Sequence, residues 1–106
     1  MFGRQVTLKL KSNSATELNR ISADEILPIL RKQKGFRDET TFIAPERSEA
    51  IVISFWDTKA DAEAYGHTAY AEVLKTLSNV IDGTPTVKNF EFATSTLQPV
   101  AASKLI

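Results

Sequence analysis

Three side chains that could do chemistry lie close together in the middle of the chain. They are Trp56, Tyr65 and His67, and the tryptophan and the histidine are the only ones in the sequence. A histidine or a tyrosine can move a proton, and tryptophan and tyrosine can form the wall of a pocket for an aromatic ligand. No serine or aspartate at a suggestive spacing completes a catalytic triad around His67. These residue types therefore predict proton transfer by His67 or Tyr65 beside an aromatic wall that includes Trp56.

Each of these residues also has a purely structural explanation. Trp56 ends an apolar segment and can serve as a core or interface aromatic, because tryptophan is large and enriched at interfaces. His67 follows Gly66 at a break in the helical pattern, where a histidine can cap a helix or face solvent. Tyr70 begins the apolar stripe of the next helix, which predicts a core position for it. Both explanations stay open for Trp56, Tyr65 and His67.

Hydrophobic periodicity predicts the elements that must position these residues. Period-2 alternation or a short apolar run predicts four strands, at residues 5–11, 36–44, 50–56 and 87–96. The first helical region covers residues 14–35 with Pro28 inside it, which favours one kinked helix over a short turn followed by a separate helix. The second helical region follows the third strand, is interrupted at Gly66 and continues to Ile81.

This order of elements, β-α-β-β-α-β, is that of the ferredoxin-like fold. It predicts an α+β domain with a four-stranded antiparallel sheet and two helices on one face. The third strand is mostly apolar on both faces, and we assign Val52 and Trp56 to the face away from the helices. A second copy of the sheet is the economical cover for that face. The sequence therefore predicts a homodimer, in which two sheets pack into a dimeric α+β barrel.

Polar residues on the predicted inner face of the barrel are further candidates for a ligand pocket. If Phe90 and Phe92 face the helices, Asn89 and Glu91 face the inside of the barrel, together with Lys9. The first and last strands are neighbours in this fold, so Lys9 and Glu91 are expected to pair. A charged pair in a dry interface is costly unless it is well satisfied. The pair is explained either by a structural position at the rim of the barrel or by a polar cavity that faces a ligand.

Composition excludes several classes of function. The 106 residues suit one domain, expected over residues 1–96 with a C-terminal tail at 97–106. Thirteen basic and thirteen acidic side chains cancel, which argues against a nucleic-acid partner. With no cysteine and a single histidine, a thiolate or histidine-cluster metal site is not expected, and the family resemblance described below implies activity without a cofactor. The chain has no signal-peptide pattern and no apolar run near the ~20 residues of a membrane span, so a cytoplasmic location without membrane contact is expected.

Three stretches carry a family resemblance: ILPILRKQKGF, SFWDTKADAEAY and YAEVLKTL. Their motifs are Gly35-Phe36 after the first helix, and an apolar strand that ends in Trp56 before an acidic helix start. With the order of elements, they make residues 6–94 resemble the dimeric α+β barrel superfamily, and within it the antibiotic biosynthesis monooxygenase (ABM) family. That superfamily includes cofactor-independent oxygenases of aromatic polyketides, haem-degrading enzymes and proteins with no known activity.

The resemblance argues against haem degradation. The haem-degrading members use an asparagine on the first strand, a tryptophan on the second helix and a proximal histidine further along. The corresponding places hold Arg4, Tyr65 and Lys75 in this chain. For cofactor-free oxygenation, the resemblance implies an enclosed pocket with tryptophan, asparagine, tyrosine and arginine around an aromatic substrate. Trp56 and Tyr65 are the residues that match such a pocket.

Three functions remain open at this stage. The resemblance favours a cofactor-independent monooxygenase that acts on a small aromatic or quinone-like substrate. The alternatives are a non-catalytic module that binds a small apolar ligand in the same cavity, and a domain whose sheet serves only dimerisation. Since a fold hosts many functions, the sequence leaves open whether the protein is an enzyme.

Overall fold

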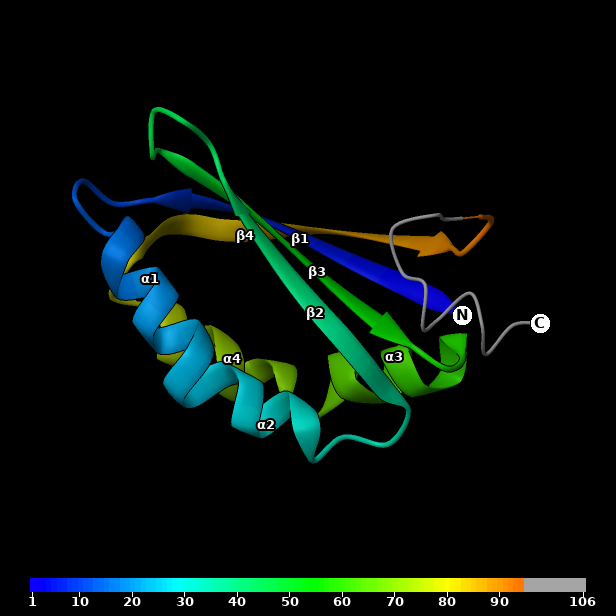
Figure 1. Ribbon diagram of the computed structural model, residues 1–106. Coiled ribbons are helices and arrows are strands. Elements are labelled where there is room, and N and C mark those ends of the chain that lie inside the picture. The colour runs from blue at the N-terminus through cyan, green and yellow to red at the C-terminus, as the bar shows by residue number, and fades with distance from the viewer. Residues whose placement is uncertain (95–106) are drawn as a thin grey trace.

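The computed structural model describes residues 1–94 and has one antiparallel sheet with every described helix on the same face (Figure 1). The elements are β1 (Phe2–Leu10), α1 (Ala15–Ile21), η1 (Ser22–Ile26), α2 (Leu27–Arg31), β2 (Phe36–Ile43), β3 (Glu49–Trp56), α3 (Lys59–His67), α4 (Tyr70–Leu77) and β4 (Ile81–Glu91). The strand order β2-β3-β1-β4 is that of the ferredoxin-like fold, so the predicted class and sheet are confirmed. The predicted tail at 97–106 lies outside the described residues.

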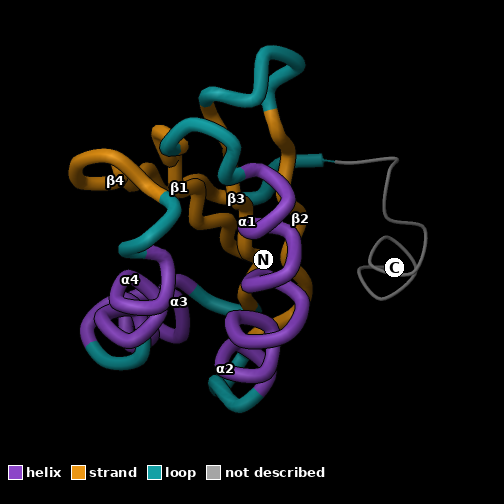
Figure 2. The backbone as a smooth tube through the Cα atoms, turned by 90° about the vertical axis from the view of Figure 1, so that its left-hand side faces the viewer, coloured by secondary structure: helices purple, strands orange, loops and turns teal. Residues whose placement is uncertain are grey.

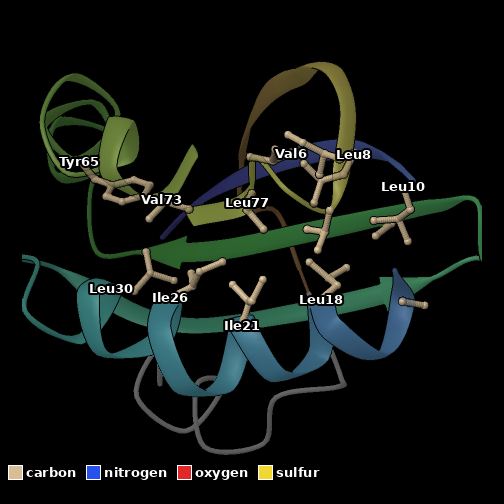
Figure 3. Close-up of a cluster of buried hydrophobic side chains, with 14 of the residues drawn as sticks. Val6, Leu8, Leu10, Leu18, Ile21, Ile26, Leu30, Tyr65, Val73 and Leu77 are labelled. Carbon is tan, nitrogen blue, oxygen red and sulfur yellow. The ribbon is translucent and has the colours of Figure 1, made fainter. Parts of the chain in front are cut away.

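The hydrophobic core lies between the sheet and two helical segments that run side by side (Figure 2). Figure 3 shows Leu18, Ile21, Ile26 and Leu30 pointing from the first segment toward the strands. Alternate residues of β1 point back toward the helices, because side chains of a strand alternate between its two faces. None of the helices in the described part of the chain is long and apolar enough to cross a membrane.

The first helical segment is continuous from Ala15 to Arg31. The sequence pattern favoured this arrangement over two separate helices. Its middle part, η1, is a π-helical turn, which takes in one more residue than an α-helical turn. The wider turn keeps Ile21 and Ile26, five positions apart, both buried on the side of the sheet. Pro28 follows directly after this π-helical turn, at the start of α2.

The boundary that helical periodicity predicts between the second helical segment and the last strand is wrong. α4 ends at Leu77 rather than at Ile81, and Ile81 begins β4. The predicted strand at 87–96 therefore started too late. Val80 is buried in the turn after α4 and Ile81 at the start of β4, and their apolar side chains continue the spacing of the preceding helix.

The two faces of β3 are opposite to the prediction. Trp56 is completely buried and lies, with Ala50 and Ser54, on the face that carries the helices. The open face of β3 carries the half-buried residues Ile51, Ile53 and Phe55. The assignment of Trp56 to the face away from the helices was therefore wrong. Val52 packs against the core on the same face as Trp56, so its assignment was wrong as well; the alternation of a strand does not show which face meets the helices.

The faces of β4 also differ from the prediction. Phe90 lies opposite Gly3 of β1, points to the open face of the sheet and is 51% exposed. Asn89 and Glu91 share the helix-side face with Val87, which packs against the core. The prediction that Asn89 and Glu91 face the inside of a barrel was therefore wrong. A strand's alternation defines two faces without saying which of them meets the helices.

The predicted pair of Lys9 and Glu91 does not form. Lys9 lies opposite Asp82, whereas Glu91 lies opposite Phe2. The antiparallel register therefore places Lys9 and Glu91 near opposite ends of β1. The two strands are neighbours as expected, but an adjacent pair of strands brings two residues together only when the register also matches.

Candidate ligand and catalytic site

Four polar side chains form a single row across the sheet, one from each strand. Arg4 of β1 is opposite Ser54 of β3 and Asn89 of β4, and Ser54 is opposite Glu39 of β2. Directly opposed residues point to the same face, so all four lie on the side of the helices. The next row toward one end contains the aromatic residues Phe36, Trp56 and Phe2, and the next row toward the other end contains Val52, Val6 and Val87. We call the four residues the polar row.

Arg4 is the buried centre of the polar row and is 8% exposed. Its guanidinium carbon lies 4.4 Å from the ring centroid of Tyr70 and 5.6 Å from that of Tyr65, which are cation–π distances. The Nε atom of Arg4 is buried without a hydrogen-bond partner, and within residues 1–94 no carboxylate forms an ion pair with this side chain. A buried cation without an anion is costly, so Arg4 is a charge that the described residues do not neutralise by an ion pair.

The second helical segment covers the guanidinium of Arg4. Its helix α3 begins at a cap, in which the hydroxyl of Thr58 accepts a hydrogen bond of 3.1 Å from the N–H of Asp61. At the other end of α3, Gly66 lies so close to Arg4 that a Cβ atom there would come within 3.2 Å of Nη1. A glycine at this position therefore lets the helix approach the guanidinium closely.

An aromatic wall closes the site on the side of Trp56. Its ring stacks on Tyr65 with centroids 5.0 Å apart, and Phe36 meets it edge-on at 5.5 Å. Tyr65 and Tyr70 are 5.9 Å apart in an edge-to-face arrangement. The indole N–H of Trp56 donates a hydrogen bond of 2.9 Å to Oγ of Ser54. The aromatic wall is thus tied to the polar row by a buried hydrogen bond.

The electrostatics of the site favour protonated side chains. Burial raises the pKa of the Tyr65 phenol well above its usual value, although Arg4 opposes that shift. Burial also raises the pKa of Tyr70, again against the influence of Arg4. Both phenols therefore remain protonated near neutral pH and can donate hydrogen bonds. Burial likewise raises the pKa of the Glu39 carboxyl, while the hydroxyl of Thr41 opposes it by hydrogen bonding, so Glu39 takes up a proton more readily than an exposed glutamate.

A cavity of about 30 Å³ lies between the polar row and the helices. Its lining includes Arg4, Glu39, Ser54, Tyr65 and Tyr70, with Ser22 contributed by the π-helical turn and aliphatic side chains around the rest. A water molecule needs roughly 10–15 Å³ of such space, whereas ligand pockets typically measure about 300–1,000 Å³. The cavity as it stands therefore accommodates a group about the size of a water molecule. An aromatic ligand requires its wall to move.

The structure brings two of the six predicted site residues together. Tyr65 lines the cavity and Trp56 stacks on it from behind without lining the cavity itself, whereas His67 is exposed at the end of α3 and does not line the cavity. Asn89 is exposed at the outer end of the polar row, and the exposed Lys9 and Glu91 also lie outside the cavity lining. Among the described residues, no three His, Asp or Glu side chains are grouped so as to hold a metal ion. The chemical roles of the six residues stay predictions.

Sequence reasoning missed Arg4 and Glu39 as site residues. The signal for Arg4 was available, because it extends the buried alternate positions of Val6 and Leu8 toward the start of β1. A charge at a core position in a strand is an anomaly that usually needs a partner or a function. Glu39 gave no such signal, because an irregularity between Phe36 and Asp38 shifts the alternation of β2.

The sheet with helices on one face is also the fold of several antibiotic biosynthesis monooxygenase structures. One similar structure is the ActVA-Orf6 monooxygenase of Streptomyces coelicolor in complex with nanaomycin D, at 16% identity and a TM-score of 0.76, covering 91% of this chain and 90% of that one. SnoaB, a cofactor-independent oxygenase from Streptomyces nogalater, has 12% identity and a TM-score of 0.71, covering 91% and 96%.

A protein from Bordetella bronchiseptica, provisionally named an antibiotic biosynthesis monooxygenase, has the same fold at 10% identity and a TM-score of 0.75, covering 88% of this chain and 97% of that one. No protein-family profile and no curated protein matches the sequence. At these identities the likeness establishes the fold, and the chemistry must be argued from the site.

Proposed function

We propose that the protein is a cofactor-independent monooxygenase that acts on a small aromatic, quinone-like substrate between the helices and the sheet. The observation that carries this proposal is the buried Arg4 guanidinium, enclosed by Tyr65 and Tyr70 beside the Trp56 wall. Aromatic side chains suit a flat substrate, and a buried positive charge stabilises the negative charge that appears when such a substrate loses a proton. The nanaomycin D complex and the cofactor-independent oxygenase among the similar structures support the same class of reaction.

The proposed reaction needs dioxygen as the oxidant. For an anthrone, a reduced precursor of a quinone, loss of a proton gives an electron-rich anion that can transfer an electron to dioxygen. The methylene group of the anthrone becomes a carbonyl, which takes one oxygen atom, and the other oxygen atom leaves as water with the two hydrogens. In this scheme Arg4 stabilises the anion, Tyr65 and Tyr70 donate hydrogen bonds, and Trp56 holds Tyr65 in position by stacking on it.

Substrate entry is assigned to the connection between α3 and α4. Tyr65 lies before this connection and Tyr70 after it, and the backbone at Thr68 leaves helical geometry. Displacement of the connection would move both tyrosines off Arg4 and enlarge the cavity. His67 lies in the same stretch, so its predicted role in proton transfer requires a ligand that reaches the end of α3.

We also propose that the active form is a homodimer. Phe42 and Phe90 are 58% and 51% exposed, and both lie on the sheet face that no described helix covers. A groove of about 260 Å³ on this face is lined in part by Ile53, Phe55 and Phe90. Exposed aromatic side chains over half-buried aliphatic ones are typical of an interface, and a second sheet offers the complementary surface.

Oxygen consumption with a panel of hydroxyanthrones tests the proposed function. We expect enzyme-dependent uptake in the presence of a metal chelator, with one atom of ¹⁸O from labelled dioxygen in the product. Tyr65→Phe should lower turnover, whereas Lys59→Gln, at an exposed position at the start of α3, should not. A rate equal to the uncatalysed one across the whole panel would contradict the proposal. A large loss in His67→Ala would restore the proton-transfer role predicted for that residue.

The small cavity favours a second candidate, a module that binds a ligand without changing it. A cavity of about 30 Å³ is too small to hold both an aromatic substrate and dioxygen. Native mass spectrometry of freshly purified protein separates the two functions. A retained small molecule that survives incubation in air unchanged would favour the binding module, whereas its conversion to an oxygenated product would favour the enzyme.

A further inference from the structure

We infer that Glu39 is the general base of this site and removes a proton from a C–H group of the bound substrate. The inference deepens the proposed function and rests on it for the substrate and its location. The proposed oxygenation needs a group that takes this proton, and the roles proposed for the arginine, the tyrosines and the tryptophan do not supply one. Glu39 comes from β2, a strand to which the proposed function assigns no role.

The first argument is the chemistry of the cavity lining. Its titratable side chains are Arg4, Glu39, Tyr65 and Tyr70. A guanidinium is always charged and has no site for a further proton. Burial raises the pKa of both phenols, so they are protonated near neutral pH and cannot act as bases. Among the described residues that line the cavity, the carboxylate of Glu39 is therefore the titratable group that can accept a proton from a substrate.

The second argument is the direction of the Glu39 side chain. An irregularity in the pairing of β2 with β3, between Phe36 and Asp38, shifts the alternation of β2. Glu39 consequently lies opposite Ser54, on the face of the sheet that carries the helices, and it lines the cavity. Because Glu39 belongs to the sheet, displacement of the connection between α3 and α4 enlarges the cavity without removing this carboxylate from it. Glu39 therefore stays beside a ligand that occupies the enlarged space.

The third argument is that the described residues leave this carboxylate free to react. Oε1 of Glu39 accepts a hydrogen bond from the hydroxyl of Thr41, whereas Oε2 accepts none within residues 1–94. No ion pair in this part of the chain joins Glu39 to Arg4, and β3 keeps their backbones about 9–10 Å apart. Burial raises the pKa of the Glu39 carboxyl against the hydrogen bond from Thr41, so its ionised form is a stronger base than an exposed glutamate.

The proposed step is a proton transfer from the methylene group of an anthrone. One C–H bond breaks, the proton moves to Oε2 of Glu39, and the electron pair stays on the substrate as an enolate, which dioxygen then oxidises. The proton on Glu39 and the remaining methylene hydrogen leave with one oxygen atom as water, while the other oxygen atom becomes the carbonyl. The carboxylate is therefore restored at the end of the turnover. A positioned base of this kind typically contributes about 10²–10⁴-fold to a rate.

Oxygen uptake with 1,8-dihydroxyanthrone tests the inference in the wild-type protein and in Glu39→Gln. The variant should lose at least about 100-fold in kcat with a nearly unchanged KM, because the amide keeps the size of the side chain but cannot take the proton. Glu46→Gln is the matched control, since it makes the same change at an exposed position in the turn between β2 and β3. A smaller loss in kcat, or a loss confined to KM, would overturn the inference.

Stability and a second variant distinguish a base from a structural residue. Glu39→Gln should be at least as stable as the wild type at neutral pH, because burial disfavours the ionised carboxylate in the folded state. Turnover that is lost while the melting temperature is unchanged or higher therefore reflects the missing base. Glu39→Asp keeps a carboxylate on a shorter side chain and should lose less kcat than Glu39→Gln. Equal losses would show that the size of the side chain matters rather than its basicity, and would overturn the inference.

Deuterium exchange without oxygen separates the inference from the proposed function. Loss of deuterium from the labelled methylene group of 1,8-dihydroxyanthrone is followed by mass spectrometry under argon, with and without the protein. If the protein takes up no oxygen with any substrate, exchange accelerated by the wild type but not by Glu39→Gln would support the base and contradict the oxygenase. No accelerated exchange in such a protein would overturn both. Oxygen uptake that survives in Glu39→Gln but is lost in His67→Ala would support the oxygenase and overturn the role of Glu39.

Discussion

Trp56 and Tyr65 stack with ring centroids 5.0 Å apart and an angle of 25° between the ring planes. The contact joins the end of β3 to α3, and both side chains lie on the same side of the sheet as Arg4. The stack therefore belongs to the packing of the helices on the sheet as well as to the candidate site. The two roles can be separated by experiment.

Trp56→Ala should lower the free energy of unfolding by about 3–5 kcal/mol, because it removes a large, completely buried side chain. The dissociation constant of the proposed dimer should not change, since Trp56 faces the helices. Urea denaturation at a fixed protein concentration and sedimentation velocity measure the two quantities. Trp56→Phe, which keeps an aromatic ring, should lose less stability. A weaker dimer with unchanged unfolding would contradict the placement of Trp56.

Tyr65→Phe should change how stability depends on alkaline pH. Burial raises the folded-state pKa of Tyr65 above its ordinary value of 10.0, so the unfolded chain releases this proton first as the pH rises. The contribution of protonated Tyr65 to the free energy of unfolding should therefore be complete below about pH 10 and be lost above that pH. The variant should lose less over the same range, as measured by chemical denaturation. Equal losses in both proteins would show that Tyr65 does not cause the effect.

Glu39→Gln should stabilise the protein at neutral pH. Burial raises the folded-state pKa of Glu39 above 4.5, so ionised Glu39 disfavours the folded state at higher pH. The advantage of the variant should disappear as the pH falls below 4.5, where both states of the wild type are protonated. Melting temperatures across this range measure the difference. Glu91→Gln, at an exposed position, is the control and should show no such advantage.

Phe42→Ser with Phe90→Ser should give a folded monomer at concentrations where the wild-type protein is a dimer. Both side chains are more than half exposed on the open sheet face, so the substitutions should leave the core intact. Sedimentation equilibrium measures the association, and far-ultraviolet circular dichroism measures the fold. A wild-type protein that is monomeric at high concentration would contradict the proposed dimer.

Gly66→Ala should lower turnover in the proposed oxygenation severalfold with little change in melting temperature. The added methyl group comes within 3.2 Å of Nη1 of Arg4 and must displace the guanidinium slightly. Alanine is about 0.5–1 kcal/mol more favourable than glycine inside a helix, which offsets the strain. The same substitution should have no further effect on turnover in Arg4→Gln. An additional loss in that background would mean that Gly66 acts independently of Arg4.

The sequence by itself determined the strands, the presence of two helical regions and hence the ferredoxin-like class. Those features depend on local periodicity, which a single chain displays directly. The sequence also made Trp56 and Tyr65 candidates, because their types and their places beside a strand end and a helix break are visible without a structure. Arg4 lay just before the predicted start of the first strand at residue 5, so its burial in β1 was not predicted.

Only the tertiary structure decided which face of each strand meets the helices and which residues share the polar row. Alternation divides a strand into two sets of side chains, but contacts with other elements choose the buried set. The irregularity between Phe36 and Asp38 then moves Glu39 to the helix side, and the register of β1 with β3 and β4 aligns Arg4 with Ser54 and Asn89. Pairing across four strands depends on long-range contacts, which local periodicity does not encode.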